Sequence, residues 1–291
     1  MLNSFIDFIS AQKRFSEHTV VAYRKDIEQF LEFAEIKNLD ECKEVNARLI
    51  RGWMVDLMEE EYATQSVNRK LSTLRTFFKW LKKEGVITEN PMKLIRGPKN
   101  NKRLPSFVQQ KQLSDVNLST IFSDDFDGVR DRLMFELLYQ TGIRLSELIG
   151  LKESNVSKSQ IKVLGKRNKE RIIPISNSLS ELIEKYKLER RQLSVSTDAL
   201  LVLKSGKILY PKFVYRRINN YLSLATDVKK KSPHVLRHTF ATHMLNNGAG
   251  LEVLKELLGH ANLSATQVYT HNSFAELTAI YSQSHPRGQQ K

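Results

Sequence analysis

The residues with the clearest potential for chemistry lie in the stretch SPHVLRHTFATH, residues 232–243. Ser232 is a typical helix N-cap and Pro233 a typical first helical residue, so we expect a helix to begin there. His234 then falls in the first turn, where free backbone N–H groups and the helix dipole favour an anion. Arg237 follows three residues later and shares a face with His234. A titratable imidazole beside a bidentate cation suits a phosphate oxyanion.

The same stretch leaves two other interpretations open. His234 and His238 have the i,i+4 spacing of a zinc-binding pair, but Val235 stands where a metalloprotease has its glutamate. No cysteine cluster supplies further ligands, because Cys42 is the only cysteine of the chain. The histidines could also serve only as hydrogen-bonding groups of a core. We predict no metal site and no cofactor.

A second candidate is TGIRLSEL, residues 141–148. Arg144 follows a glycine that ends one helix and precedes another helix, and this position directs a guanidinium into a cleft. A plain helical turn in which Arg144 pairs with Glu147 explains the octapeptide equally well.

A third candidate is LLGHANLSATQVYTH, residues 257–271. Gly259 is placed to end a helix, which leaves His260 at its terminus, and Tyr269 follows nine residues later. Taken alone, a tyrosine in such a setting is usually a half-buried packing residue.

Charge indicates the kind of partner. The 291 residues include 46 Lys and Arg against 32 Asp and Glu, for a formal net charge of +14, which favours a polyanion such as nucleic acid. Residues 1–100 hold 17 basic and 15 acidic side chains, whereas residues 101–291 hold 29 and 17, so the excess lies in the second part. A single cysteine excludes an internal disulfide, and no apolar run suggests a membrane span or a signal peptide.

Composition divides the chain at residues 96–106, RGPKNNKRLPS, which have the Gly, Pro and Asn content of a linker. Residues 1–95 show helical periodicity throughout and predict a helical bundle. Residues 107–291 alternate helical patterns with one hairpin, QIKVL and ERIIPI around a turn at 165–169. The predicted fold class is mainly α with a small antiparallel β-sheet (α+β).

Several polar and basic residues outside these motifs are candidates for contact with a phosphate backbone. They lie at the entry to the last helix of the first part, in the linker and in the hairpin turn: Asn68, Arg69, Lys70, Lys102, Arg103, Arg167 and Lys169. Ordinary capping and solvation account for the same residue types.

In combination, the motifs resemble the tyrosine recombinase family, specifically its Xer-like members. The resemblance is carried by TGIRLSEL, GKRNKERIIPI, HVLRHTFATHML, LLGHANLSATQVYTH and the terminal HPRG. It extends to the first part in FSEHTVVAYRKDIEQFLEF and SVNRKLSTLRTFFKWL, so it covers nearly the whole chain. It implies a helical, SAM-like core-DNA-binding domain over 1–95 and a catalytic domain over 107–291.

The resemblance implies an enzyme that cuts one DNA strand through a 3′-phosphotyrosyl intermediate without metal or ATP. It implies six catalytic residues, which are Arg144, Lys166, His234, Arg237, His260 and Tyr269. Tyr269 would be the nucleophile, His234 would accept its proton, and Lys166 would protonate the leaving 5′-oxygen. The arginines would neutralise the phosphorane, and His260 would orient it.

The resemblance also suggests partners and a role. The expected partner is double-stranded DNA with a specific recombination site, bound by a tetramer on two sites, and the apolar stripe of the tail at about 273–291 would dock on a neighbouring protomer. A second related recombinase and a DNA translocase are further candidate partners. We expect a cytoplasmic, nucleoid-associated enzyme of chromosome dimer resolution.

Three alternatives remain at this stage. The first is an integrase or resolvase of a mobile element with the same chemistry. The second is a DNA-binding regulator without chemistry, and the third is a type IB topoisomerase, which shares the chemistry but acts at random sites.

Overall fold

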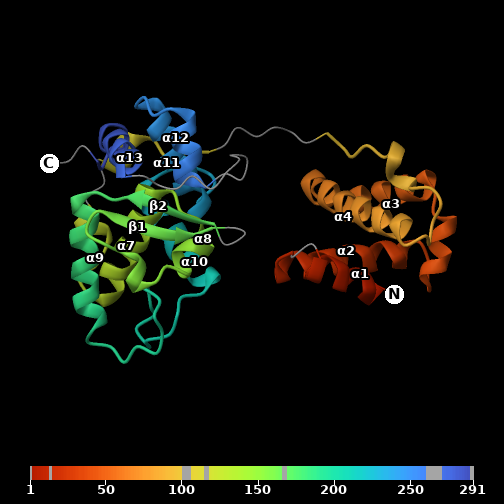
Figure 1. Cartoon of the computed structure of the whole chain (residues 1–291), viewed down its shortest axis with the longest axis horizontal. Helices are drawn as coiled ribbons and strands as arrows, with labels where there is room; N and C mark the ends of the chain where they lie inside the picture. The colour runs from red at the N-terminus through yellow and green to blue at the C-terminus, as the bar shows by residue number, and fades with distance from the viewer. Residues whose placement is uncertain are drawn as a thin grey trace. The chain divides into compact units, whose positions relative to one another are not determined.

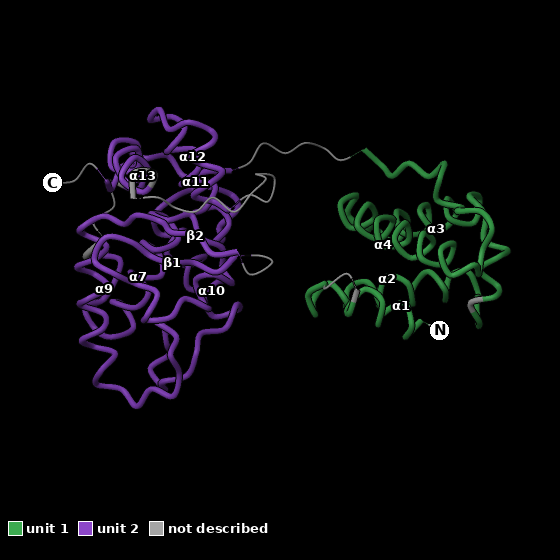
Figure 2. Tube along the Cα trace, viewed as in Figure 1, with its two compact units in different colours: residues 1–103 green, residues 104–291 purple. Residues whose placement is uncertain are grey.

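The computed structural model describes residues 2–12, 15–99, 106–114, 118–165, 169–259 and 271–288. The chain divides into two compact units, Met1–Arg103 and Leu104–Lys291 (Figure 2). Within the described ranges, the helices are all too short or too polar to cross a lipid bilayer.

The first unit is helical, with short 3₁₀ and π segments between the main helices (Figure 1). Its elements are α1 (Leu2–Asp7), η1 (Phe8–Gln12), α2 (Glu17–Phe33), η2 (Leu39–Glu44), α3 (Ala47–Glu59), α4 (Thr64–Lys83) and η3 (Pro91–Leu94). Side-chain caps fix where these elements begin: Ser16 accepts from the Thr19 N–H, and Asn46 accepts from the first turn of α3.

Aromatic side chains fill the core of the first unit. Both tryptophans of the chain lie there: Trp53 is fully buried and Trp80 is 7% exposed. Phe30 meets the Trp53 indole edge to face with ring centroids 5.2 Å apart, and Phe5 meets Trp80 at 5.4 Å.

The second unit holds all the remaining described elements. They are α5 (Gln110–Ser114), α6 (Leu118–Ile121), α7 (Phe126–Thr141), α8 (Leu145–Ile149), η4 (Glu153–Asn155), β1 (Gln160–Leu164), β2 (Glu170–Pro174), α9 (Asn177–Arg190), α10 (Pro211–Ala225), α11 (Pro233–Asn246), α12 (Leu251–Leu258) and α13 (His271–Ser284). Helix α7 is buried along nearly its whole length and packs against α9 and α11. It therefore forms the centre of the unit.

The strands β1 and β2 form a two-stranded antiparallel sheet, in register from Gln160 opposite Pro174 to Leu164 opposite Glu170. Together with the helices, this sheet confirms the predicted fold class, mainly α with a small antiparallel β-sheet.

Helix α13 packs on the unit to which it belongs. Its residues Leu277 and Tyr281 are buried in the main core of that unit, and His285 just beyond it is fully buried. The Asn247 side chain donates to the Ser284 carbonyl at 2.7 Å, and the His285 ring stacks on Tyr281. In this single chain the apolar stripe of the tail is therefore covered intramolecularly.

Candidate active site

Arg144 stands at the junction of two helices. Helix α7 ends at Gly142, whose φ of +59° is the left-handed conformation that glycine adopts readily. Arg144 is the N-cap residue of α8, and its backbone N–H and its Nη1 both donate to the Glu147 carboxylate at 2.7 Å. Its side chain is 30% exposed, so the guanidinium is paired and also accessible to a ligand.

Arg237 reaches the same place from α11. Its Nη1 donates to the carbonyl of Gly142, and its Nη2 donates to that of Leu258 at 2.8 Å. Burial, reinforced by the positive charge of Arg144, lowers the pKa of Arg237 to about 10 although Glu147 opposes the shift. The side chain therefore remains a cation at neutral pH, at 7% exposure.

Glu147 joins Arg144 to a third arginine. Arg171, on β2, makes a bidentate pair with the Glu147 carboxylate, with N–O distances of 3.0 and 2.8 Å. Burial alone would raise the pKa of Glu147, but the hydrogen bonds and charge of Arg171, with those of Arg144, lower it to about 2. The carboxylate is ionised at neutral pH and accepts from both guanidinium groups.

The C-terminal end of α12 brings the three arginines together. The carbonyls of Leu257, Leu258 and Gly259 accept hydrogen bonds from Arg171, Arg237 and Arg144, respectively. These are among the carbonyl groups that the helix leaves unpaired, and they carry its partial negative charge. The end of the helix thus holds three cations in a fixed arrangement, two of which the sequence analysis selected.

His234 lies where the sequence analysis expects it, in the first turn of α11 after Ser232 and Pro233. Its side chain is exposed, whereas Arg237, one turn later, is buried. His238 is half-buried, and burial together with the nearby His234 lowers its pKa. No group of three metal-binding side chains occurs among the residues described.

Lys166, His260 and Tyr269 lie outside the described residues. The structure describes the glycines that precede the first two. A Cβ added at Gly165 would lie 3.5 Å from Nη1 of Arg171, and one added at Gly259 would lie 3.1 Å from the same atom. Gly165 and Gly259 therefore lie beside Arg171.

The sequence-predicted DNA contacts have different surroundings. Lys70 is 6% exposed, and its ammonium bonds to the buried carboxylate of Asp26, which also pairs with the half-exposed Arg69. Asn68 donates to the carbonyl of Pro98 at 2.9 Å. Lys169 is exposed, whereas Lys102, Arg103 and Arg167 lie outside the described residues.

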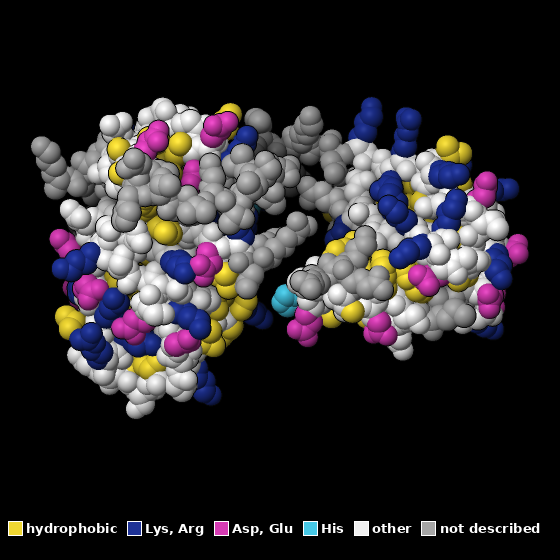
Figure 3. Space-filling model, in the orientation of Figure 1, with side chains coloured by type: hydrophobic (Ala, Val, Ile, Leu, Met, Phe, Trp, Pro, Cys, Tyr) yellow, Lys and Arg dark blue, Asp and Glu magenta, His cyan; other side chains and the backbone are white. Residues whose placement is uncertain are grey.

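Helix α4 carries cations that the sequence analysis did not select. Arg75, Lys79 and Lys83 are exposed at i, i+4 and i+8, and they line a pocket of about 700 Å³ with Ser72 and Thr76. Figure 3 shows Lys and Arg side chains gathered on a face of the first unit. The helical spacing alone could have identified this stripe.

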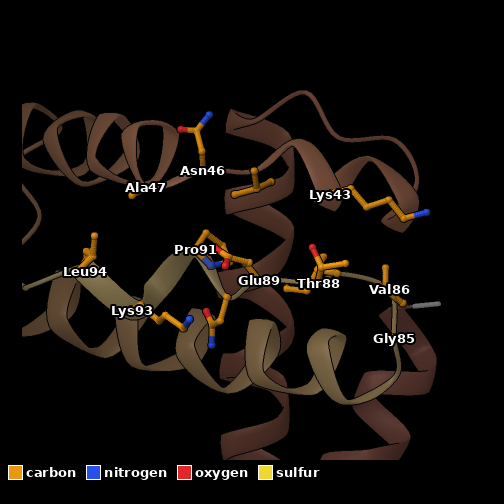
Figure 4. A pocket seen from close by; sticks show the side chains of 13 residues that line it. Lys43, Asn46, Ala47, Gly85, Val86, Thr88, Glu89, Pro91, Lys93 and Leu94 are labelled. Carbon is orange, nitrogen blue, oxygen red and sulfur yellow. The ribbon is translucent and has the colours of Figure 1, made fainter.

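A second pocket of about 590 Å³ lies in the first unit between η2, the start of α3 and the segment 85–94 (Figure 4). Its walls include Asn46, Thr88, Pro91 and the exposed Leu94. The arginine cluster belongs to the other unit and contributes nothing to this pocket.

Comparison with known proteins identifies the family. Residues 107–276 match the model of the phage integrase family, and residues 2–85 match that of the phage integrase N-terminal SAM-like domain. The chain belongs to the phage integrase family, as a Xer-like tyrosine recombinase, an enzyme that cuts and rejoins DNA strands. The resemblance found in the sequence is confirmed.

The chain aligns with individual relatives over most of their length. The chain is 38% identical over 293 residues to tyrosine recombinase XerC of Anoxybacillus flavithermus (strain DSM 21510 / WK1), which covers 98% of this chain and 97% of that protein. The XerA recombinase crystal structure matches at 27% identity and a TM-score of 0.50, over 98% of both chains. The post-cleavage complex of XerH with palindromic difH matches at 22% identity and a TM-score of 0.71, over 91% of this chain and 79% of that chain, which is a likeness of fold.

Proposed function

We propose that Arg144 and Arg237 hold the scissile phosphate of a specific DNA site in this recombinase. The observation that supports this is the convergence of both guanidinium groups at the end of α12, just before the segment that contains His260 and Tyr269. Only part of each guanidinium's five N–H donors is used by protein acceptors. The others are available to the phosphate oxygens.

The reaction needs negative charge to be neutralised as it develops. Attack by Tyr269 Oη forms a phosphorus–oxygen bond and breaks the bond to the 5′-oxygen, through a phosphorane with added charge on its non-bridging oxygens. Arg237 is anchored on two backbone carbonyls, so this cation needs no rearrangement when the charge appears. Such preorganised donors contribute about 3–4 kcal/mol each in comparable sites.

The proton transfers are assigned to the remaining candidates. A phenol with an ordinary pKa of about 10 must lose its proton as it attacks, and we assign the acceptance of that proton to His234, whose side chain is exposed. Lys166 gives a proton to the leaving 5′-oxygen, and His260 orients the phosphate. The phosphotyrosyl bond retains the energy of the phosphodiester, so that rejoining requires no ATP.

A nicked suicide substrate tests this assignment. The short fragment released by cleavage diffuses away, so the strand cannot be rejoined and the covalent protein–DNA adduct accumulates. Tyr269→Phe should abolish the adduct while DNA binding persists. The matched control is Tyr215→Phe, at an exposed tyrosine of α10, which should leave adduct formation intact. An adduct formed by the Tyr269 variant would contradict the assignment of the nucleophile.

The biological role proposed here is chromosome dimer resolution, supported by the full-length similarity to XerC proteins. The alternative role is that of a mobile-element integrase. The neighbouring genes would distinguish the two roles, since they show whether the gene lies in a mobile element or in a core locus. A second related recombinase, a DNA translocase and a nucleoid location belong to the same proposal. The test is a pull-down from the nucleoid fraction with this chain as bait. Recovery of neither a second recombinase nor a translocase would argue against these partners.

We further propose that the tail at about 273–291 is exchanged between protomers in a tetramer on two sites. The covered stripe of α13 supplies the apolar surface for such a contact, and its present partners are groups on the same chain. Sedimentation on a two-site synapse with and without the tail tests this. A truncated chain that still assembles and recombines would refute the exchange.

The domain boundaries proposed are 1–95, a linker at 96–106, and 107–291. The two compact units separate after Arg103. Contacts are described on both sides of the linker. On the side of the first unit, the side chains of Asn68 and Arg75 donate to the carbonyls of Pro98 and Ile95. On the other side, Thr239 and His243 of α11 bond to Val108 at 2.9 Å each.

The basic stripe of α4 is proposed as an additional contact with the DNA backbone. Affinity should fall steeply as salt rises, because phosphate contacts release counterions. Lys79→Ala should reduce the slope of log K against log salt by about one. Lys70→Ala provides the comparison, since the ammonium of Lys70 is buried on Asp26 and the slope should not change.

A further inference from the structure

We propose that Arg171 is a positioning residue for strand cleavage, which fixes Arg144 through Glu147 and holds in place the two glycines that precede Lys166 and His260. This inference rests on the proposed function of the arginine cluster. Arg171 follows several other basic residues near the hairpin turn, and the local sequence does not distinguish it from them.

Arg171 is not itself placed to bind DNA. It is 4% exposed, and each of its three guanidinium nitrogens has a protein acceptor. Nε donates to the Leu257 carbonyl at 2.7 Å, and Nη1 and Nη2 donate to the two oxygens of Glu147. These bonds join β2 to α8 and to the end of α12.

The link to Arg144 is direct. The carboxylate of Glu147 accepts four N–H bonds, two from Arg171 and two from Arg144. A bidentate guanidinium–carboxylate pair is planar, so Arg171 fixes the plane of the carboxylate. The fixed plane of the carboxylate in turn limits the rotamers of Arg144. The Arg144 side chain is partly exposed, so it could turn away from the site if Glu147 were not held in place.

The two glycines add a second constraint. Nη1 of Arg171 lies close to both Gly165 and Gly259, where added Cβ atoms would be at 3.5 and 3.1 Å. Gly259 also has a φ of +63°. The guanidinium therefore packs between the backbone preceding Lys166 and the backbone preceding His260. The side chain of Arg171 therefore contacts Glu147, the partner of Arg144, and lies beside both glycines.

Arg171→Lys is the direct test, because lysine keeps the positive charge but loses the planar fork of donors. With the suicide substrate at saturating enzyme, adduct formation should slow on the order of 100-fold, the effect of misplacing a reacting group by about 1 Å. The dissociation constant for the intact DNA site should not change, since Arg171 faces away from solvent.

A second substrate separates positioning from general loss of structure. A methylphosphonate at the scissile position replaces one charged non-bridging oxygen with a methyl group, which removes part of the charge that Arg144 neutralises. The defects of Arg144→Ala and of Arg171→Lys should both shrink by about tenfold on this substrate. A defect of equal size on phosphate and on methylphosphonate would overturn the proposal.

Arg190→Lys is the matched control. Arg190 is 9% exposed and bonds to a carboxylate, Glu153, and to the carbonyls of Thr197 and Ala199 at 2.9–3.0 Å. It resembles Arg171 in burial and partners but lies outside the arginine cluster. The melting temperature of Arg190→Lys should fall by about as much as that of Arg171→Lys, while its cleavage rate should stay at the wild-type value.

Three further outcomes have distinct meanings. If Arg171→Lys does not fold, Glu147→Gln breaks the same link and is assayed on the phosphate and methylphosphonate substrates. Its cleavage defect should likewise be smaller on methylphosphonate. A wild-type chain that forms no adduct would contradict the proposed function. A wild-type chain that forms the adduct at the same rate as Arg171→Lys would contradict only the positioning role.

Discussion

Replacement of Gly142 by alanine tests the packing behind the arginine cluster. The φ of +59° at Gly142 costs an L-residue about 1–2 kcal/mol. The new Cβ would lie 2.5 Å from Cδ1 of Phe240 and 2.9 Å from Cδ2 of Leu258, and both side chains are buried. Overpacking of this kind costs about 1–3 kcal/mol more. The expected loss of unfolding free energy is therefore about 2–5 kcal/mol.

Gly248→Ala isolates the backbone part of this cost. Gly248 has a φ of +92°, but a Cβ there meets nothing within 4 Å. Its expected loss is only the strain of about 1–2 kcal/mol. For a unit of this size each kcal/mol lowers the melting temperature by about 2–4 °C, so calorimetry separates the variants. Gly142→Ala melting at or above Gly248→Ala would refute the packing argument.

The same pair of variants links packing to chemistry. The carbonyl of Gly142 accepts from Arg237, so movement of this backbone displaces the guanidinium. Adduct formation should slow in Gly142→Ala well beyond any loss of folded protein, and it should be normal in Gly248→Ala. Suicide-substrate rates measured well below both melting temperatures give the comparison.

Three other predictions concern buried charge. Asp26→Asn leaves the ammonium of Lys70 buried without its carboxylate and should cost about 3–5 kcal/mol in urea unfolding; an unchanged midpoint would contradict the buried pair. Burial, with the charges of His243 and Arg287, lowers the pKa of His285 to about 3, although its bond to a backbone carbonyl opposes this. Because the unfolded imidazole protonates near 6.5, the docking of α13 is fully stable above about that pH and weakens as the pH falls toward 3. Hydrogen exchange of α13 amides, corrected for intrinsic rates, should therefore accelerate between pH 7 and 5, and His285→Gln should remove that acceleration. The pKa of Glu147, about 2, implies stability that is complete above about pH 4.5 and is lost as the pH falls toward 2. Glu147→Gln should lack that acid-dependent loss in urea midpoints measured across this range.

The sequence predicted the positions of Arg144 and Arg237 because both follow from local rules. A glycine ends one helix before Arg144, and a Ser-Pro pair begins another before Arg237. Their hydrogen bonds to the end of α12 could not be predicted, since these join residues 21 to 115 positions apart. Only the tertiary fold brings such groups together.

The cations were the hardest residues to interpret from sequence. Lys70 lies in a basic stretch that resembles a phosphate-binding site, yet its partner is Asp26, 44 residues away on α2. Conversely, no role was predicted for Arg171, which occupies a buried position of β2 and pairs with Glu147, 24 residues away. Pairing across elements decides which charges remain available to DNA, and local patterns do not encode it.

Both tryptophans of the chain lie in the first unit, and residues 104–291 have none. Indole emission excited beyond the absorption of tyrosine therefore reports on that unit alone, through Trp53 and Trp80 in its aromatic core. The catalytic unit contains no tryptophan and therefore does not fluoresce at this excitation wavelength. If Trp53 and Trp80 were replaced by phenylalanine, a single tryptophan placed on an exposed surface of the second unit would report on that unit instead. Each unit of the enzyme could then be followed by its own tryptophan fluorescence.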